Sequence, residues 1–298
     1  MEWLARMNRA LDYIEENLCG KIDYRRLEKA ACCSAHTFLK MFSYVADVSL
    51  AVYIRRRRLT LAALELQSGG VKVIDTALKY GYESPVSFAR AFQAMHGITP
   101  SQAIKGGLVL KAYPRISFQI LITGVEQMDY RIERKEAFKV FGIEGVFRTD
   151  ESGPHPKTPA DLWKDCHADG SIKKLDTDAG RPPAFVPQNL DNVHAICSYN
   201  EVAAGEFPYM ICAFAGEQSN TEGYTIIDVP AHTWAVFPSG KFAWDEMNNV
   251  MESLYKRFFA EWLPTSQYEQ VGGLDMELYG GDEGQGYVEI WFAVRELT

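Results

Sequence analysis

Apolar residues recur at helical spacing through the first third of the chain. In the stretch VIDTALKYGYESPVSFARAF, which begins at Val73, they repeat every three or four residues on either side of Gly81 and Ser84. Ser84 is placed to cap a second helix, and Pro85 then falls at the first helical position, where a missing N–H costs nothing. The pattern predicts two helices joined by a tight turn, which is either a DNA-binding helix-turn-helix or an ordinary helical hairpin.

The same spacing occurs a second time, nearer the N-terminus. The pattern S-x3-F-x3-F starts at Ser34 as well as at Ser84. Between the two copies, residues 49–67 contain neither Gly nor Pro, which predicts one helix of about 25–30 Å at about 1.5 Å per residue. A helix of that length can hold two reading helices, the helices that enter DNA grooves, about 34 Å or one turn of B-DNA apart. The repeat therefore favours a DNA-binding unit over a simple hairpin.

These features together resemble the AraC/XylS-type transcriptional regulators, whose DNA-binding unit is two helix-turn-helix motifs joined by a long helix. The resemblance rests on the two S-x3-F-x3-F motifs, the linking YIRRRRLTLAA and the closing GITPSQ, and it covers residues 1 to about 105. It implies double-stranded promoter DNA as a partner, with RNA polymerase as a candidate second partner. The positions that it expects to face DNA are His36, Thr37 and Lys40 on the first reading helix and Val86, Ser87 and Arg90 on the second.

One departure from that family lies in the first turn. Cys32 and Cys33 stand where the family usually has a Gly and an aliphatic residue, so we expect the first motif to be less regular than the second. The six cysteines show no CxxC spacing, and we interpret them as buried or turn residues, with redox sensing by the adjacent pair as the alternative. No metal-binding or nucleophile motif occurs, so we predict no cofactor, no metal site and no catalytic residue.

Charge is distributed unevenly along the chain, whose net charge is −8. Residues 1–107 carry 15 Lys and Arg against 10 Asp and Glu, whereas residues 108–298 carry 16 against 29. A basic first third suits DNA, although part of the run Arg55–Arg58 fits a solvated or ion-paired face equally well. The N-terminal stretch reads as an amphipathic helix, and no run of about eighteen apolar residues occurs. A cytoplasmic protein without membrane contact is therefore expected.

Alternation of apolar and polar residues replaces the helical pattern beyond about residue 108. The segments that begin at Tyr130 and Tyr224 both predict a strand, a short turn and a strand, and each is followed by a helix and a further strand pair. This internal repeat predicts an α+β domain of two pseudo-symmetric strand-helix repeats over residues 125–298. The fold class is therefore multi-domain: an all-α DNA-binding domain of residues 1–107, a linker of residues 108–124 and the α+β domain.

The last predicted strand, YVEIWFAV, indicates where a small molecule could bind. Its apolar face, with Val288 and Phe292, is expected to pack on helices, while Glu289 lies on the opposite face between Tyr287 and Trp291. A carboxylate between aromatic rings suits an organic cation. The alternative is that Glu289 is exposed to solvent and that the rings reflect only strand propensity. On the neighbouring strand, one face carries Asp275, Glu277 and Tyr279.

The second domain also resembles a known family, the GyrI-like effector-binding domains that often follow an AraC-type DNA-binding domain. The resemblance rests on YRIERKEAFKVFGIEG, EWLP, DMELY and EIWFAV, and it covers about residues 128–297. It implies a cleft with an acidic residue among aromatic ones and a small lipophilic cation as effector. Glu289 is the first candidate for that acid and Glu277 the second. The accompanying aromatic residues are Trp234, Tyr279, Trp291 and Tyr287.

The strand YMICAFA of the first half has no acid, so only one half should supply the charge. The resulting hypothesis is a sequence-specific transcriptional regulator whose second domain senses a small effector. Two alternatives stay open at this point. The second domain could hydrolyse a reactive small molecule, with Glu289 or Glu277 beside Tyr279 as a general base, or it could bind a protein partner in place of a ligand.

Overall fold

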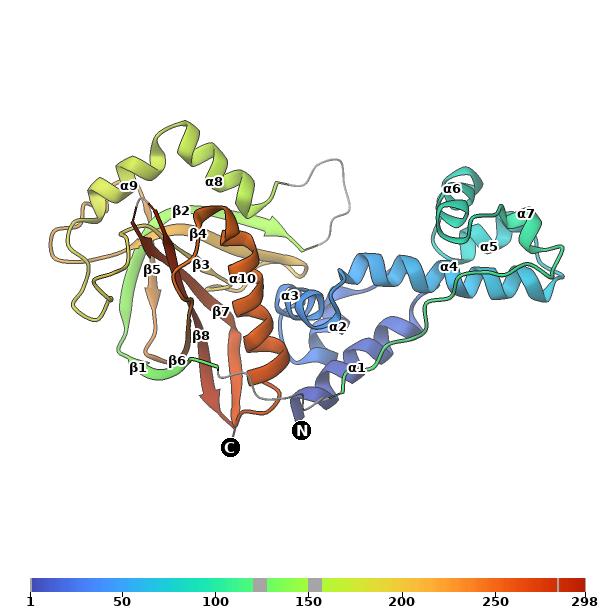
Figure 1. The fold of residues 1–298 in the computed structure, drawn as a ribbon, viewed down its shortest axis with the longest axis horizontal. Coiled ribbons are helices and arrows are strands. Elements are labelled where there is room, and N and C mark those ends of the chain that lie inside the picture. Colours follow the sequence, from blue (N-terminus) through green and yellow to red (C-terminus); the bar gives the residue numbers. More distant parts are fainter. Residues whose placement is uncertain (1, 120–127, 150–156, 283, 298) are drawn as a thin grey trace. The chain divides into compact units, whose positions relative to one another are not determined.

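The computed structural model describes residues 2–119, 128–149, 157–282 and 284–297 (Figure 1). By its packing, the chain divides into two compact units. Residues 1–32 and 46–120 form the first, which we call the helical unit, and residues 33–45 and 121–298 form the second, which we call the sheet unit. The predicted first reading helix thus packs with the sheet unit, although the predicted domain division assigned it to residues 1–107.

The predicted long helix organises the helical unit. It is α4, which starts after the N-cap Ser49, and the predicted tight turn with its two flanking helices follows it. Leu59 and Leu66 of α4 pack against Phe88 and Phe92 in a buried cluster that α7 closes. The described helices of this unit are α1 (Glu2–Glu16), α2 (Tyr24–Ala31), α4 (Leu50–Ser68), α5 (Val73–Lys79), α6 (Pro85–His96) and α7 (Pro100–Ala103).

Part of the arginine run in α4 has a structural role. Arg57 forms an ion pair of 2.8 Å with Glu15 of α1 and donates a hydrogen bond to the carbonyl of Tyr113. The start of the predicted linker therefore lies against the helices, and the side chain of Asn8 pairs with the backbone of Phe118 in both directions. Residues 120–124 of that linker lie outside the described residues.

The sheet unit contains the predicted repeat. Two copies of a strand pair, a helical segment and a second strand pair follow one another along the chain, which confirms the α+β expectation. Helix α3 (Ala35–Ala46) packs with them. The first copy consists of β1 (Arg131–Lys135), β2 (Phe138–Arg148), α8 (Pro159–Ala168), α9 (Ser171–Ala179), β3 (His194–Cys197) and β4 (Glu206–Phe214). The second consists of β5 (Thr225–Val229), β6 (His232–Pro238), η1 (Trp244–Glu246), α10 (Met247–Lys256), η2 (Arg257–Trp262), β7 (Tyr268–Gly281) and β8 (Gly286–Glu296).

The eight strands that the structure describes join one antiparallel sheet in the order β1-β6-β8-β7-β3-β4-β2-β5. The two copies meet where β3 pairs with β7. The short strands β1 and β5 do not pair with the strands that follow them. Instead β1 pairs with β6 of the second copy, and β5 pairs with β2 of the first. Each half of the sheet therefore ends on a strand that the other half supplies.

The two faces of the sheet are covered differently. Phe292 of β8 stacks on Phe258 at a centroid distance of 3.6 Å, so α10 and η2 cover the face that the alternation of YVEIWFAV predicted. Helices α8 and α9 pack on the same face through Cys166 and Leu175. The opposite face holds a second core that includes Trp234 and Trp291, and the loop segment at Phe185 and Val186 packs on it. Both faces are therefore buried.

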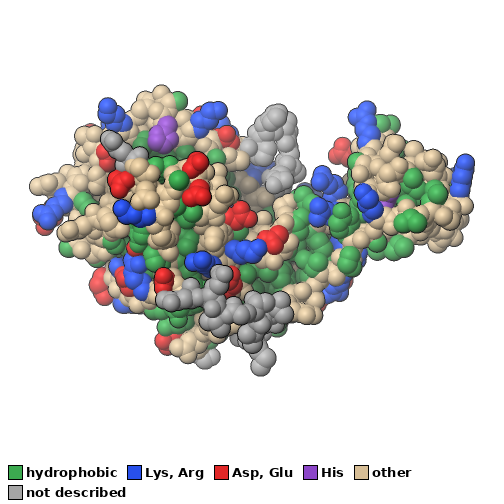
Figure 2. All heavy atoms as spheres, viewed as in Figure 1, with side chains coloured by type: hydrophobic (Ala, Val, Ile, Leu, Met, Phe, Trp, Pro, Cys, Tyr) green, Lys and Arg blue, Asp and Glu red, His purple; other side chains and the backbone are tan. Residues whose placement is uncertain are grey.

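The surface combines charged and apolar side chains. Figure 2 shows hydrophobic side chains among Lys and Arg on the part formed by α4–α7, and side chains of both charge signs over the sheet. The exposed apolar residues of α4–α6 include Leu64, Ile74, Leu78 and Val86. Within the described residues, no helix by itself is long and apolar enough to span a membrane, and α3 and α4 meet that test only when they are taken together.

Candidate functional sites

The second reading helix, α6, leaves its expected DNA-facing residues open. Ser84 caps the helix by accepting a hydrogen bond of 3.1 Å from the N–H of Ser87, as the sequence predicts. Phe88 is fully buried and fixes the inner face of the helix. On the outer face, Val86 is 61% exposed, and Ser87 and Arg90 are exposed as well. A short apolar and cationic patch of this size suits a DNA groove.

The first reading helix, α3, starts in the same way. Ser34 accepts a hydrogen bond of 3.1 Å from the N–H of Thr37, which is the counterpart of the Ser84 cap. The turn before it contains Cys32 in the left-handed region at a φ of 54°, whereas the second turn has Gly81 at 79°. A side chain in that region costs on the order of 1–2 kcal/mol. The first turn therefore forms without a glycine, at a cost in backbone strain that the second turn avoids.

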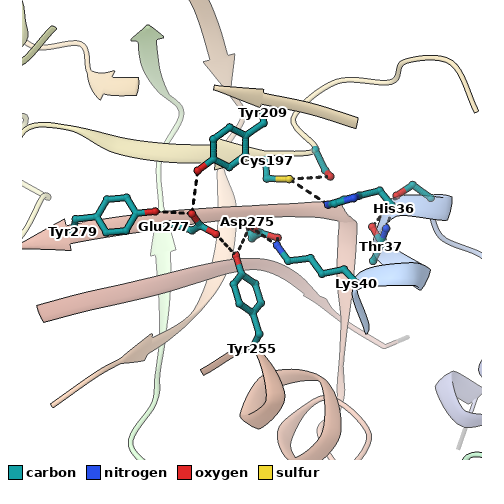
Figure 3. A network of polar contacts seen from close by, with 11 residues as sticks. His36, Thr37, Lys40, Cys197, Tyr209, Tyr255, Asp275, Glu277 and Tyr279 are labelled. Carbon is teal, nitrogen blue, oxygen red and sulfur yellow. Dashed lines mark hydrogen bonds and ion pairs between the residues drawn. The ribbon is translucent and has the colours of Figure 1, made fainter. Parts of the chain in front are cut away.

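The expected DNA-facing side chains of α3 point into the sheet unit (Figure 3). The ring of His36 stacks on Phe207 at a centroid distance of 3.6 Å, and its Nε2 lies 3.5 Å from the Sγ of Cys197. Burial, with a smaller effect of the Lys40 charge, lowers the pKa of His36 well below its ordinary value. His36 is therefore neutral where it lies.

Lys40 of α3 contacts both an acid and an aromatic ring. Its Nζ lies 3.1 Å from the Oδ2 of Asp275 and 3.9 Å from the ring centre of Tyr255. The side chain of Lys40 is 16% exposed and that of Asp275 is 2% exposed. Burial is the largest influence on the pKa of Lys40 and by itself would lower it, but the negative groups around the ammonium, Asp275 first and Glu277 among the others, together raise it. The ammonium group is therefore charged and lies in a site that is almost closed to solvent.

Two carboxylates and three phenols form that site, which we call the carboxylate site (Figure 3). Asp275 and Glu277 lie on one face of β7, and the hydroxyl of Tyr255 lies 3.0 Å from the first and 2.8 Å from the second. Tyr279 and Tyr209 donate to Glu277 at 2.6 and 3.3 Å. Burial, aided by the carboxylate charges, raises the pKa of all three phenols well above its ordinary value. The phenols therefore remain hydrogen-bond donors.

Burial also sets the electrostatics of Asp275. It raises the pKa of this carboxyl group, and the charge of Lys40 opposes that rise. Glu277, two residues along the strand, adds a second negative charge on the same face. A pair of carboxylates removed from water gains most from a nearby cation, because the low polarity of the surroundings strengthens the attraction.

A bulge in β7 brings α3 close to the sheet. The pairing of β7 with β8 shifts register between Gln270 and Asp275, and Gly273 within the bulge has a φ of 84°. A Cβ atom at Gly273 would lie 1.9 Å from the Oγ1 of Thr37, which is itself only 6% exposed. Glycine therefore serves two purposes here, since it accepts the left-handed backbone and it leaves room for α3.

Glu289 lies on the other face of the sheet. It is 2% exposed, so it is not a solvated carboxylate. Arg131 pairs with it at 2.7 Å, and both Trp291 and Tyr287 donate to it at 2.8 Å. Trp234 is fully buried in the core on that face. A cation of the chain itself thus already neutralises the first candidate acid.

The ligand-binding candidates from the sequence therefore fall into two groups that cannot line one site. Glu277 and Tyr279 belong to the carboxylate site, on the helix-covered face. Glu289 and its aromatic neighbours lie on the opposite face. Both acids of the carboxylate site belong to β7 of the second copy. That only one half supplies the charge for a ligand stays a prediction.

Sequence reasoning missed Tyr209 and Tyr255 and gave Asp275 no role. The alternation of LDMELY places Asp275 beside Glu277 and was the available signal for it. Tyr209 and Tyr255 come from β4 and α10, and no local pattern connects those elements to β7. Among the described residues, no group of three or more metal-ligating side chains is assembled, and none of the six cysteines forms a disulfide.

Comparisons with known proteins agree with this division of the chain. A family model described as a helix-turn-helix domain matches residues 27–106. The transcriptional activator AarP of Providencia stuartii is 38% identical over 91 residues, which are 30% of this chain and 67% of AarP. The regulatory protein SoxS of Escherichia coli K12 is 34% identical over 89 residues, which are 30% of this chain and 83% of SoxS.

The second domain matches a family model described as integron-associated effector binding protein over residues 131–294. A solved integron cassette protein of Vibrio cholerae aligns with 56% of this chain and 95% of its own at 16% identity and a TM-score of 0.38. The structure of SAV2435 bound to tetraphenylphosphonium aligns with 56% of this chain and 94% of its own at 19% identity and a TM-score of 0.44.

Fold and matches together define a helix-turn-helix DNA-binding protein with an effector-binding domain. The chain belongs to the AraC-type transcriptional regulators, and its C-terminal half is a GyrI-like domain of the integron-associated effector-binding family. Both resemblances seen in the sequence are thereby confirmed, and so is the fold class. A DNA partner and a small-molecule ligand follow from membership in these families.

Proposed function

We propose that the C-terminal domain senses a small lipophilic organic cation at the carboxylate site and thereby controls promoter binding. The observation that carries this proposal is the pairing of Asp275 and Glu277 among three tyrosine rings on the face between α8 and α10. Opposite charge and ring faces attract an organic cation together, and a cation of the chain already occupies the position.

DNA binding rests on the two reading helices. We assign His36, Thr37 and Lys40 of α3 and Val86, Ser87 and Arg90 of α6 to DNA contacts. The exposure of the α6 residues supports this assignment. RNA polymerase is the macromolecular partner that such a regulator would meet at a promoter, and the cytoplasm is the compartment in which it would do so.

Binding, and not catalysis, is the role that suits Glu277. Three phenol groups lie within hydrogen-bond distance of its carboxylate. A carboxylate whose lone pairs are engaged in this way is held as a fixed negative charge, which recognises a cation better than it removes a proton from a substrate. A sensor also returns its ligand unchanged, so mass spectrometry of the ligand after prolonged incubation separates the two roles.

Titration of the full-length protein with tetraphenylphosphonium tests the proposed site. Tetraphenylborate serves as a probe of the same shape and opposite charge. We expect binding of the cation alone, and a loss of about 1–3 kcal/mol of binding free energy in Glu277→Gln. Glu217→Gln, which removes an exposed carboxylate, is the matched control.

Two results would contradict the proposed site. Equal affinity for the cation and the anion would show that charge is not recognised. A loss of binding in Glu289→Gln, with none in Glu277→Gln, would move the site to the opposite face of the sheet. Thermal unfolding of each variant distinguishes lost binding from lost folding.

A further inference from the structure

We propose that Lys40 is a built-in competitor of the effector, so that α3 either docks on the carboxylate site or reads DNA. This inference rests on the proposed function, because it assigns the regulation of the same site. In the docked state the chain supplies its own cation, and an effector cation would replace it. Release of α3 would then make the first reading helix available to DNA.

The chemistry of the contact is that of a bound ligand. The ammonium group of Lys40 combines an ion pair to Asp275 with a position over the ring of Tyr255. These are the two interactions that an organic cation would use in this site. The Lys40 side chain is 16% exposed. An effector of the same charge therefore cannot occupy this position until Lys40 has left it.

Other residues of α3 are fitted to the sheet unit as well. His36 stacks on Phe207, and Tyr44 stacks on Tyr255 at a centroid distance of 5.1 Å. Thr37 lies over Gly273, where any side chain would collide with it. Ring stacking, an ion pair and the close approach at Gly273 are spread along the helix, so docking does not depend on a single contact.

The docked face is also the expected DNA-reading face. His36, Thr37 and Lys40 are the three positions of α3 assigned to DNA, and all three contact the sheet unit. One face of a helix cannot lie in a DNA groove and on a protein sheet together. The docked chain therefore has one reading helix available, namely α6.

Linkage fixes the direction of the response. Effector and DNA both bind the undocked state of α3, so each should raise the affinity for the other. If α3 is docked about 90% of the time, the apparent affinity for either ligand is reduced about tenfold. Variants that undock α3 should therefore bind DNA or effector about tenfold more tightly than wild type.

The first experiment measures effector affinity in the full chain. Tetraphenylphosphonium is titrated into wild type and into Lys40→Met, which keeps the apolar stem and removes the charge. We expect about tenfold tighter binding in the variant, because the competitor is gone. Lys105→Met removes an exposed cation of the helical unit and should bind as wild type does. If Lys40→Met binds tetraphenylphosphonium as wild type does, while Glu277→Gln loses affinity as expected, Lys40 is not a competitor of the effector. The proposed effector site would then still hold.

The second experiment measures DNA affinity without effector, by fluorescence anisotropy on a random-sequence duplex. Asp275→Asn should bind about tenfold more tightly than wild type. Asp228→Asn, which removes a carboxylate with a 79% exposed side chain, is the charge-matched control. Tyr44→Ala loosens docking with every charge in place and should act in the same direction, even if Asp275→Asn folds poorly.

The two experiments separate the two proposals. If no variant binds tetraphenylphosphonium but Asp275→Asn and Tyr44→Ala bind DNA more tightly than wild type, docking stands and the cationic effector falls. If both variants bind DNA no better than Asp228→Asn does, the competition between docking and DNA reading is overturned, whatever the effector.

Discussion

Helices α3 and α6 carry the same motif and lie in different surroundings. Each begins with a serine that caps the third residue after it, and each buries two phenylalanines completely. Each has a cation six residues after that serine, Lys40 in α3 and Arg90 in α6. Arg90 is exposed, whereas Lys40 lies in an ion pair on the sheet. A repeated motif thus fixes a local fold, while residues far along the chain decide what that fold contacts.

The difference arises in β7 and not in the helices. Asp275 supplies the charge, and the bulge at Gly273 supplies the clearance. Neither feature has a described counterpart against α6. The two copies of the motif therefore differ in their surroundings, with the outer face of α6 left open and that of α3 docked on the sheet.

The largest expected effect concerns the buried phenylalanines that both helices have. Phe88→Ala removes a fully buried ring from the cluster between α4 and α6. We expect a loss of about 3–5 kcal/mol in the free energy of unfolding, measured by chemical denaturation. Val86→Ala, at a residue that is 61% exposed, should change stability little. Equal effects of the two substitutions would break the comparison, because α6 would then lack the fixed inner face.

An intermediate effect concerns the two cations. Arg90→Ala should weaken DNA binding by about 1–3 kcal/mol and lower the slope of log K against log salt by about 1. Lys40→Ala should have a smaller net effect, because the lost phosphate contact is opposed by the undocking of α3. Anisotropy across a salt series measures both variants.

Arg181→Ala removes an exposed cation of the sheet unit and is the control for net charge. A wild-type result for Arg90→Ala would remove α6 from the DNA interface. The contrast between an open α6 and a docked α3 would then no longer concern DNA binding.

The smallest expected effect is a dependence on pH. The docked His36 has a pKa well below its ordinary value of about 6.5, so a proton binds the undocked helix preferentially. Docking should be at full strength well above pH 6.5 and should weaken as pH falls through that value. Between about pH 7.5 and 6.0 the loss is about 0.8 kcal/mol, and it should appear as tighter DNA binding.

His36→Phe keeps a ring on Phe207 and cannot take up a proton. The groups that face His36 are Lys40 on its own helix, Cys197 with Ser198, and Phe207. If wild type and His36→Phe respond to pH alike, other groups cause the change and His36 does not report docking.

The local features of the fold were predictable from the sequence. The cap at Ser84, the uninterrupted stretch before Gln67 and the alternation of YVEIWFAV depend on neighbours within a few residues, and the structure confirms each of them. The internal repeat was visible for the same reason. The partners of β1 and β5 were not, because pairing across the two copies leaves no trace in the local pattern.

The carboxylate site could be predicted only in part. Alternation places Glu277 and Glu289 on strands, but it does not reveal that a cation of the chain pairs with an acid on each face of the sheet. Arg131 comes from β1, and Lys40 comes from a helix more than two hundred residues before β7. Contacts over such separations depend on the register of the whole sheet, and one sequence does not reveal it.

The exchange of β1 and β5 has a consequence for the history of the domain. A chain with only one half of the repeat would lack the edge strand that its sheet requires. Two such chains would each complete their sheet by lending the first strand to the other, as in a domain-swapped dimer. The present domain has the form of that dimer fused into a single polypeptide. The two halves of this fused form differ in charge, because β7 carries Asp275 and Glu277 whereas its counterpart β3 carries no acid.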